Sequence, residues 1–394
     1  MGVVQSGVSW GARRDGVVFG VSVDYSSALD SVIEDVIAPQ ATEIDRAGEF
    51  PRAAVEALGK AGFLGLLSSS EVGGGGKSLA DGVNVIERLA GTCGSTAMVV
   101  LMHYAATAII EAHGKDETRR AIAAGDHLTT LAFSEAGSRS HFWAPMSSAK
   151  SDGNGTVQLD ASKSWITAAG QADSYVWSSR PLTGDGPMTL WFVPSNSDGL
   201  AVKGKFDGLG LRGNASNPVS GEAVEVPKDA ILGGDGAGLD IALATALPYF
   251  LVLNAAFSLG LMQALIAEAG EHLKNTKLAH LGETLADQES HRVRYAQLLT
   301  KTDEVRAFIQ DTLLALGTER PDATLRVLQV KAVAAEAATE VADGVMRLCG
   351  GSAFRKELGV ERRFRDALAA RVMAPTTEAL RDFVGRATLG LPLF

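Results

Sequence analysis

Cysteine is scarce in this sequence, and its absence removes several classes of protein. Only Cys93 and Cys349 occur among 394 residues, and they stand far apart. Two such residues build neither a disulfide framework nor a cysteine-rich metal site, and they suit a reducing, cytoplasmic compartment. The seven histidines form no His-Glu-x-x-His motif and no compact set with carboxylates. We therefore expect no metal centre.

Basic residues are also in short supply. The chain has 36 Lys and Arg against 46 Asp and Glu, which gives a net charge of −10. Proteins that bind nucleic acid gather Lys and Arg on one face to contact phosphates, and no such cluster is present here. We expect no nucleic-acid partner.

One long stretch lacks charge entirely. No charged residue lies between Ile241 and Ala267, a length that would suffice to cross a bilayer. Pro248, Asn254 and Gln263 interrupt the stretch, and no Lys or Arg flanks it. The many Ala and Gly residues favour a helix packed closely by other helices. We predict an enclosed core helix and no membrane span.

The composition and hydrophobic periodicity of the sequence change twice along the chain after residue 23. Residues 1–23 have no clear pattern and are predicted to be an extension. Residues 24–128 have helical periodicity and residues 129–236 alternate β-branched and aromatic residues with turn signals, which predicts a small sandwich or barrel. Residues 237–394 return to helices, among them Thr324–Leu348 with an apolar stripe. The predicted fold class is α+β.

Short motifs that carry a family resemblance follow one another along the chain. They are Ile44-Asp45-Arg46 with Phe50-Pro51, Gly62-Phe63-Leu64-Gly65, Leu131 through Ser140, Lys163-Ser164-Trp165-Ile166-Thr167, Leu209-Gly210-Leu211-Arg212-Gly213, Val226-Pro227, Cys349-Gly350-Gly351 and Arg365-Asp366. In this order and spacing they resemble the acyl-CoA dehydrogenase family of flavoproteins over nearly the whole chain after residue 24. The resemblance implies a helical N-terminal domain, a central β-domain and a C-terminal four-helix bundle.

The same resemblance implies FAD as cofactor and a homotetramer as the assembly. It places Trp165 beside the flavin ring, Thr167 near the flavin N5 and Ser134 at the pyrimidine edge. The full set of implied FAD contacts is Ser134, Ser140, Trp165, Thr167, Lys277, Gln288, Gly350, Gly351, Thr376 and Glu378. Gly350 and Gly351 would approach the pyrophosphate of a neighbouring subunit's FAD. The implied substrate is an acyl-CoA or a related small molecule, with an electron-transfer flavoprotein, or a flavin reductase and oxygen, as redox partner.

The sequence departs from the family at the catalytic base. Family dehydrogenases remove a proton next to the thioester carbonyl with a glutamate, while a hydride moves to the flavin. In most members this glutamate precedes the last helix, where the present chain has Ala374. In others it lies on the first bundle helix, where the present chain has Phe250. Both positions therefore lack a proton acceptor.

Three interpretations follow from the missing base. The first is an FAD-dependent acyl-CoA oxidoreductase that uses another base, for which His141 and Tyr249 are weak candidates. The second is a flavin-dependent monooxygenase of the same fold, which uses reduced flavin and oxygen and needs a dry pocket. The third is a relative that binds acyl-CoA or flavin without catalysis. The sequence does not identify the substrate, the electron acceptor or the catalytic residue.

Overall fold

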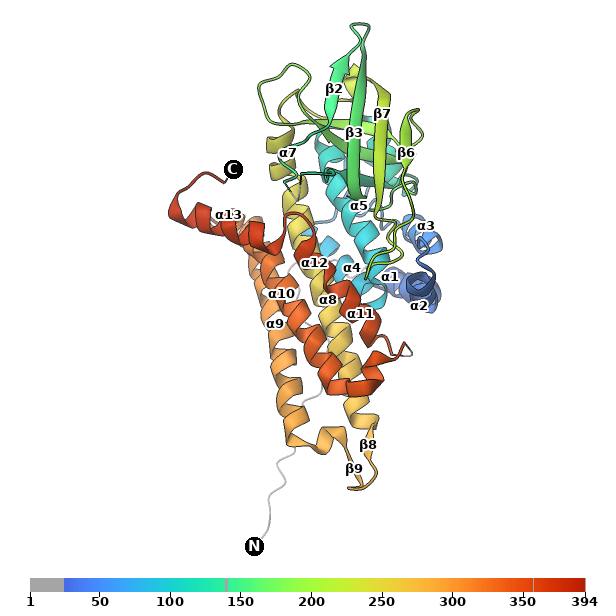
Figure 1. The fold of residues 1–394 in the computed structure, drawn as a ribbon, viewed down its shortest axis with the longest axis vertical. Coiled ribbons are helices and arrows are strands. Elements are labelled where there is room, and N and C mark those ends of the chain that lie inside the picture. The colour runs from blue at the N-terminus through green and yellow to red at the C-terminus, as the bar shows by residue number, and fades with distance from the viewer. Residues whose placement is uncertain (1–24, 139–140, 357, 394) are drawn as a thin grey trace.

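The computed structural model describes residues 25–138, 141–356 and 358–393. The predicted extension, residues 1–23, lies outside the described residues. The chain passes from a group of helices into β-strands and then into long helices that run beside the first group (Figure 1). The predicted order of helical, β and helical parts is therefore confirmed.

The N-terminal part consists of short helices wrapped around a buried central one. Its elements are α1 (Ser26–Val32), the π-helical turn η2 (Ile33–Ile37), α2 (Ala38–Ala47), α3 (Arg52–Lys60), the short turn η3 (Ser70–Val72), α4 (Leu79–Thr92), α5 (Gly94–His113) and α6 (Asp116–Ala123). Ser78 begins α4 with a reciprocal capping box to Asp81, which satisfies backbone N–H groups at the start of the helix. Most side chains of α5 are buried, so this helix forms one wall of the interior.

The β-part forms two open sheets. The strands are β1 (Thr129–Ala132), β2 (Ser148–Ser151), β3 (Thr156–Ile166), β4 (Ser174–Ser179), β5 (Thr189–Pro194), β6 (Leu200–Val202) and β7 (Asn217–Pro227), and the turn η4 (Lys228–Ala230) follows. One sheet has the order β1-β4-β5, with β1 parallel to β4, and the other has the order β2-β3-β7-β6. Trp177 and Trp191 of the first sheet share a core with Val157 and Val219 of the second. The sandwich alternative of the prediction is the one observed.

The C-terminal part is an elongated bundle. It contains α7 (Gly238–Ala244), α8 (Ala246–Asn275), the small β8 (Lys277–Leu278) and β9 (Glu283–Thr284), η5 (Leu285–Asp287), α9 (Glu289–Gly317), α10 (Ala323–Cys349), η6 (Gly350–Phe354), α11 (Val360–Ala367), α12 (Ala369–Val372) and α13 (Thr377–Leu389). Helices α8, α9, α10 and α13 are its long members, and α10 packs against the other three. The apolar stripe predicted for Thr324–Leu348 is buried in α10. The predicted bundle is therefore confirmed.

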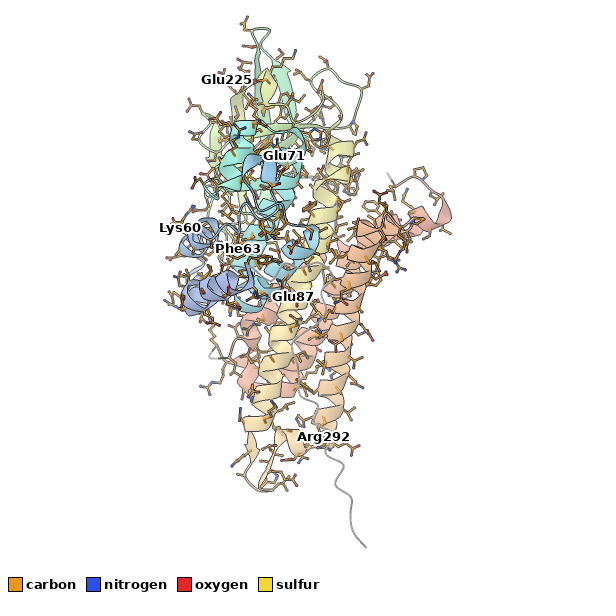
Figure 2. The ribbon with its side chains drawn as sticks, turned by 180° about the vertical axis from the view of Figure 1, so that it is seen from behind. Lys60, Phe63, Glu71, Glu87, Glu225 and Arg292 are labelled. Carbon is orange, nitrogen blue, oxygen red and sulfur yellow. The ribbon has the colours of Figure 1, made fainter. Side chains whose placement is uncertain are left out.

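The molecule is long, and its two ends carry different parts of the chain. Glu225 of β7 lies at one end and Arg292 of α9 near the other, while Phe63 lies between them (Figure 2). Helix α8 alone has 30 residues, so it spans about 45 Å. Groups near the two ends of α8 therefore lie too far apart to contact each other.

Two helical segments are apolar and long enough to cross a membrane by length and composition, Gly94–His113 and Gly238–Asn275. In each, 83% of the most apolar window is buried inside the fold. Burial by neighbouring helices is what the core helices of a soluble protein show. The enclosed core helix predicted from the uncharged stretch is present.

Candidate active site

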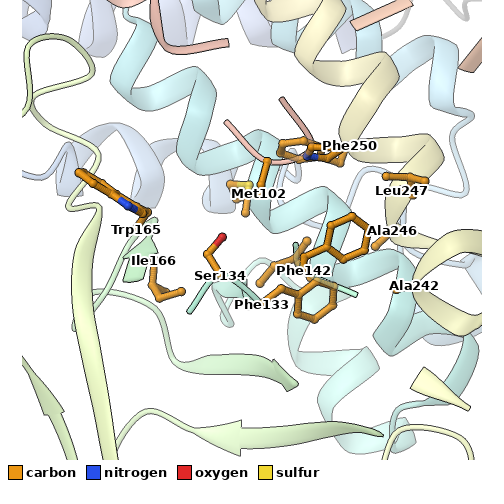
Figure 3. A pocket seen from close by; sticks show the side chains of 13 residues that line it. Met102, Phe133, Ser134, Phe142, Trp165, Ile166, Ala242, Ala246, Leu247 and Phe250 are labelled. Atoms are coloured by element: carbon orange, nitrogen blue, oxygen red, sulfur yellow. The ribbon is translucent and has the colours of Figure 1, made fainter. Parts of the chain in front are cut away.

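A cavity lies where the β-part meets α5 and the start of α8 (Figure 3). It holds about 540 Å³ of empty space, counting its open mouth. Its lining residues are Met102, Leu131, Phe133, Ser134, Phe142, Trp165, Ile166, Ala242, Ala246, Leu247, Phe250, Ala374 and Pro375. None of these side chains ionises near neutral pH. The cavity is thus an apolar site in which Ser134 supplies the one side-chain hydroxyl.

Trp165 forms one side of this cavity because the end of β3 is irregular. The pairing of β3 with β7 shifts register between Lys163 and Ile166, and Trp165 has a φ of +58°. A bulge of this kind re-aims a side chain, and a positive φ on a bulky residue costs free energy that the surrounding structure must supply. Trp165 is 70% exposed as a result. Its indole face is available to a flat aromatic group.

Thr167 is buried near Trp165 in the chain, whereas Ser134 lines the cavity with Trp165. Thr167 is buried, and its Oγ1 lies 3.3 Å from Ser216 Oγ. Ala168 follows with a φ of +57°, so unusual backbone flanks Thr167 on both sides. Ser134 lies between Trp165 and the rings of Phe133 and Phe142 (Figure 3). The structure therefore brings Ser134 and Trp165 to one cavity, whereas Thr167 is buried and is not among the lining residues. Ser140 lies outside the described residues.

A buried ion pair fixes the segment that carries Ser134, and sequence reasoning missed its role. Lys163 Nζ donates to Glu135 Oε1 at 2.5 Å and to the Ser178 carbonyl at 2.7 Å, and both charged side chains are buried. Glu135 also accepts hydrogen bonds from the N–H groups of Met146 and Ser147. Burial lowers the pKa of Lys163 to about 8, and the Lys163 charge and these hydrogen bonds hold the pKa of Glu135 below its ordinary value. The sequence could have suggested this pair, because Glu135 and Lys163 both belong to motifs that carry the family resemblance.

Ala374 and Phe250 both line the cavity, as expected for the two positions at which the family places its base. Phe250 comes from α8 and Ala374 from the segment between α12 and α13. No carboxylate takes their place among the described lining residues. The two positions at which the sequence differs from the family's glutamate therefore both lie in the wall of this cavity.

A buried lysine lies behind Ala374, and the sequence gave no reason to single it out. Lys331 of α10 is 1% exposed and donates to the carbonyls of Met373 at 2.8 Å and Pro375 at 2.7 Å. Its Nζ lies 5.7 Å from the centre of the Phe250 ring. This amine ties together the backbone on both sides of Ala374. It therefore fixes the position of the wall that Ala374 forms.

Titration of Lys331 should make stability depend on pH. Burial lowers the pKa of Lys331 from 10.5 to about 7. Between those two values the unfolded chain holds more protons than the folded one, so the free energy of unfolding should rise with pH across this window. One such group contributes at most about 1.4 kcal/mol per pH unit. The free energy of unfolding, measured with urea at several values from pH 7 to 10, should rise less steeply with pH for Lys331→Met than for the wild type.

A matched control separates this effect from other groups that titrate in the same range. Lys150 is exposed on β2, so Lys150→Met removes a lysine without removing a buried amine. This variant should keep the wild-type slope. An equal slope in Lys331→Met and the wild type would contradict the assignment.

The two weak candidates for an alternative base do not line this cavity. His141 is exposed, and its Nδ1 lies 2.8 Å from the Ser138 carbonyl oxygen. Tyr249 lines a separate cavity beside α5. Neither residue is therefore in the lining that Ala374 and Phe250 share.

The other predicted FAD contacts fall into two groups. Thr376 caps α13 by accepting from the Ala379 N–H, and Glu378 lies in the first turn of that helix, next to the cavity wall. Lys277, Gln288, Gly350 and Gly351 lie on or next to β8, η5 and the end of α10, away from the β-part (Figure 1). Helix α8, which spans about 45 Å, separates Lys277 of this second group from the cavity at its start.

Comparison with known proteins identifies the fold and the relatives. Family models for the N-terminal, middle and C-terminal domains of acyl-CoA dehydrogenase match residues 24–125, 130–224 and 236–389. The chain is 27% identical over 391 residues to the probable acyl-CoA dehydrogenase FadE25 of Mycobacterium tuberculosis, covering 97% of this chain and 100% of that protein. It is 27% identical to the mitochondrial short-chain specific acyl-CoA dehydrogenase of Bos taurus, covering 88% and 85%.

Solved structures show the same architecture. Butyryl-CoA dehydrogenase from Megasphaera elsdenii superposes with a TM-score of 0.88 at 22% identity, covering 94% of this chain and 100% of that one. FkbI, described for biosynthesis of a methoxymalonyl extender unit, superposes with a TM-score of 0.83 at 24% identity, covering 92% and 99%. Three consecutive domain matches and full-length relatives lead to one conclusion: the chain belongs to the acyl-CoA dehydrogenase family.

Proposed function

We propose that this protein is an FAD-dependent oxidoreductase that acts on an acyl-CoA or a similar acyl substrate without the family's glutamate base. The observation that carries the proposal is the cavity lining, where Trp165 and Ser134 face the positions of Ala374 and Phe250. In this proposal the residues expected to contact the flavin are present, and the positions of the proton acceptor hold residues that cannot accept a proton.

The residues present fit a flavin. An isoalloxazine ring needs a flat apolar wall and hydroxyl or N–H donors along its edge. Trp165 supplies an exposed aromatic face, and Ser134 supplies a hydroxyl beside it. At the far end of the bundle, a Cβ added to Gly350 or Gly351 would meet no atom within 4 Å, which leaves room for a phosphate group. FAD, when bound, would supply the redox chemistry.

The same positions support a homotetramer. Lys277 follows the far end of α8, about 45 Å from the start of that helix, so we expect the two groups of FAD contacts to come from different chains. Phe354, next to the two glycines, is 84% exposed, and Leu389 near the end of α13 is 77% exposed. Large exposed apolar side chains of this kind are typical of surfaces that another subunit covers. We propose a cytoplasmic homo-oligomer whose subunits complete each other's cofactor sites.

The chain's own residues would position the substrate and exclude water. Phe133, Phe142 and Phe250 present aromatic rings to the cavity, and Lys331 holds the wall that contains Ala374. With no carboxylate in place, a proton removed from the substrate has no acceptor on this wall. Ordinary dehydrogenation of a saturated acyl chain should therefore be slow.

Anaerobic mixing of the purified flavoprotein with acyl-CoAs of different length tests this proposal. We expect acyl-CoA binding to perturb the flavin spectrum, with bleaching far slower than in family members that carry the glutamate. Rapid bleaching would show that another base acts. A protein that takes up no FAD would overturn the proposal itself.

The apolar lining favours a second candidate, a flavin-dependent monooxygenase of the same fold. Oxygenation needs a pocket that keeps water from reduced flavin, and it needs no substrate base. The test is to reduce the flavoprotein and mix it with oxygen. A long-lived spectrum that differs from both oxidised and reduced flavin would support oxygenation, and immediate return of the oxidised spectrum would count against it. Binding of acyl-CoA without either reaction would leave a non-catalytic role.

A further inference from the structure

A second cavity lies between α5, the junction of α7 and α8, and the segment that contains Leu67. It holds about 710 Å³ of empty space, counting its open mouth. Its lining residues are Leu67, Tyr104, Thr107, Ala108, Glu111, Ala112, Ala244, Thr245 and Tyr249. It shares no lining residue with the cavity that contains Ala374. Nothing in the proposed function requires it.

Two buried polar atoms of this cavity have no hydrogen-bond partner within the described part of the chain, and a tyrosine also lines it. Thr107 is 1% exposed, and its Oγ1 is unpaired. Glu111 Oε1 is buried and unpaired as well. Tyr249 contributes a hydroxyl, and burial together with the Glu111 charge raises its pKa, which keeps this hydroxyl neutral. Buried polar groups are nearly always satisfied, so two unpaired atoms in one cavity indicate a missing partner.

The Glu111 carboxylate is held in a fixed orientation by its other oxygen. Oε2 accepts from Arg119 Nη2 at 3.1 Å and Nε at 3.3 Å, and from the Ser69 N–H at 3.3 Å. Arg119 also donates to Asp116 at 3.0 Å, so its charge is shared. With Oε2 occupied, Oε1 remains free to accept. Thr107 and Glu111 are four residues apart on α5, which places them on one helix face.

The other hydroxyls of the cavity already have hydrogen-bond partners, so the groups without partners determine which ligand would fit. Tyr104 donates to the Phe63 carbonyl at 2.6 Å, and Thr245 donates to the Ile241 carbonyl at 2.6 Å. Thr107 and Tyr249 have no such acceptor. The polar groups left over are a carboxylate oxygen and two hydroxyl oxygens, all of which can accept a hydrogen bond. A ligand that complements these oxygens must therefore donate hydrogen bonds.

We propose that this cavity binds a small primary alkylammonium ion. The ammonium group has three N–H donors, which match Glu111 Oε1 and the oxygens of Thr107 and Tyr249. A charged donor on a carboxylate forms the stronger class of hydrogen bond. The alkyl chain would lie against Leu67, Ala108 and Ala244.

Isothermal titration of the FAD-loaded protein with n-butylammonium chloride at neutral pH tests the site. 1-Butanol has the same chain without the charge and should bind at least about tenfold more weakly. Glu111→Gln should weaken butylammonium binding by about tenfold or more, and Thr107→Val, which keeps the side-chain shape, by severalfold. Glu117→Gln is the matched control, because Glu117 is exposed on the neighbouring helix α6 and should not change binding.

The flavin absorbance of each variant serves as a check that the fold is intact. If Glu111→Gln does not fold, Thr107→Val and the butanol comparison still decide the outcome. The absence of binding heat with butylammonium would mean that the cavity holds water only and would overturn the proposal. Equal affinity for butanol, or unchanged affinity in a folded Thr107→Val or Glu111→Gln variant, would overturn it too.

Discussion

Replacing Ala374 with glutamate should accelerate acyl-CoA dehydrogenation by this protein. The substitution places a carboxylate on the cavity wall that faces Trp165 and Ser134 across the site. A positioned general base contributes about 10²- to 10⁴-fold, so anaerobic flavin bleaching by an acyl-CoA should accelerate by at least about 100-fold. Stopped-flow absorbance with the purified Ala374→Glu variant measures this rate.

Two further variants make that experiment decisive. Ala374→Gln has nearly the same shape but accepts no proton, so it should bleach as slowly as the wild type. Phe250→Glu places a carboxylate on α8 instead, within reach of the buried Lys331 amine. Equal rates for the Glu and Gln variants at 374, together with no gain from Phe250→Glu, would show that more than the base is missing.

Replacing Lys163 with methionine should produce the largest loss of stability among the changes considered. The substitution leaves the Glu135 carboxylate buried without its cation. Breaking a buried ion pair by removing one partner costs about 3–5 kcal/mol. We expect the urea unfolding midpoint to fall, and FAD retention to fall with it, because Glu135 follows Ser134 directly in the chain.

The double variant Glu135→Gln with Lys163→Met supplies the control for this prediction. It removes both charges, so no unpaired ion remains, and its loss of stability should be well below that of Lys163→Met alone. An exposed pair such as Lys150 and Asp160, 3.7 Å apart, should contribute less than about 1 kcal/mol when broken. A double variant as unstable as the single one would show that packing around Lys163, and not charge pairing, determines the effect.

Much of the site was predictable because it depends on short, continuous segments. The Lys163–Thr167 motif placed Trp165 in the site, and the structure puts Trp165 and Ser134 in the lining of one cavity. The prediction that no carboxylate stands at 374 or 250 needed only residue identity at aligned positions. The proposed substitutes His141 and Tyr249 were chosen by residue type alone, and neither lines the cavity.

Other features depend on residues far apart in the chain and could not be read from local patterns. Lys331 contacts carbonyls 42 and 44 residues away, and an isolated lysine in an Ala-rich helix gives no sign of such partners. The exposure of Trp165 depends on the register shift between β3 and β7. The second cavity joins α5 to the start of α8, which the sequence separates by more than a hundred residues.

The sequence by itself determined the order of helical and β parts and the identity of the residues at positions 374 and 250, because periodicity and residue identity are local properties of a chain. Tertiary structure decided which buried charges have partners and which do not. Lys163 is paired with Glu135 and Lys331 with two backbone carbonyls, whereas one oxygen of Glu111 is buried without a partner among the described residues. Whether a buried polar group is satisfied depends on neighbours brought close only by folding, since hydrogen bonds act over about 3 Å.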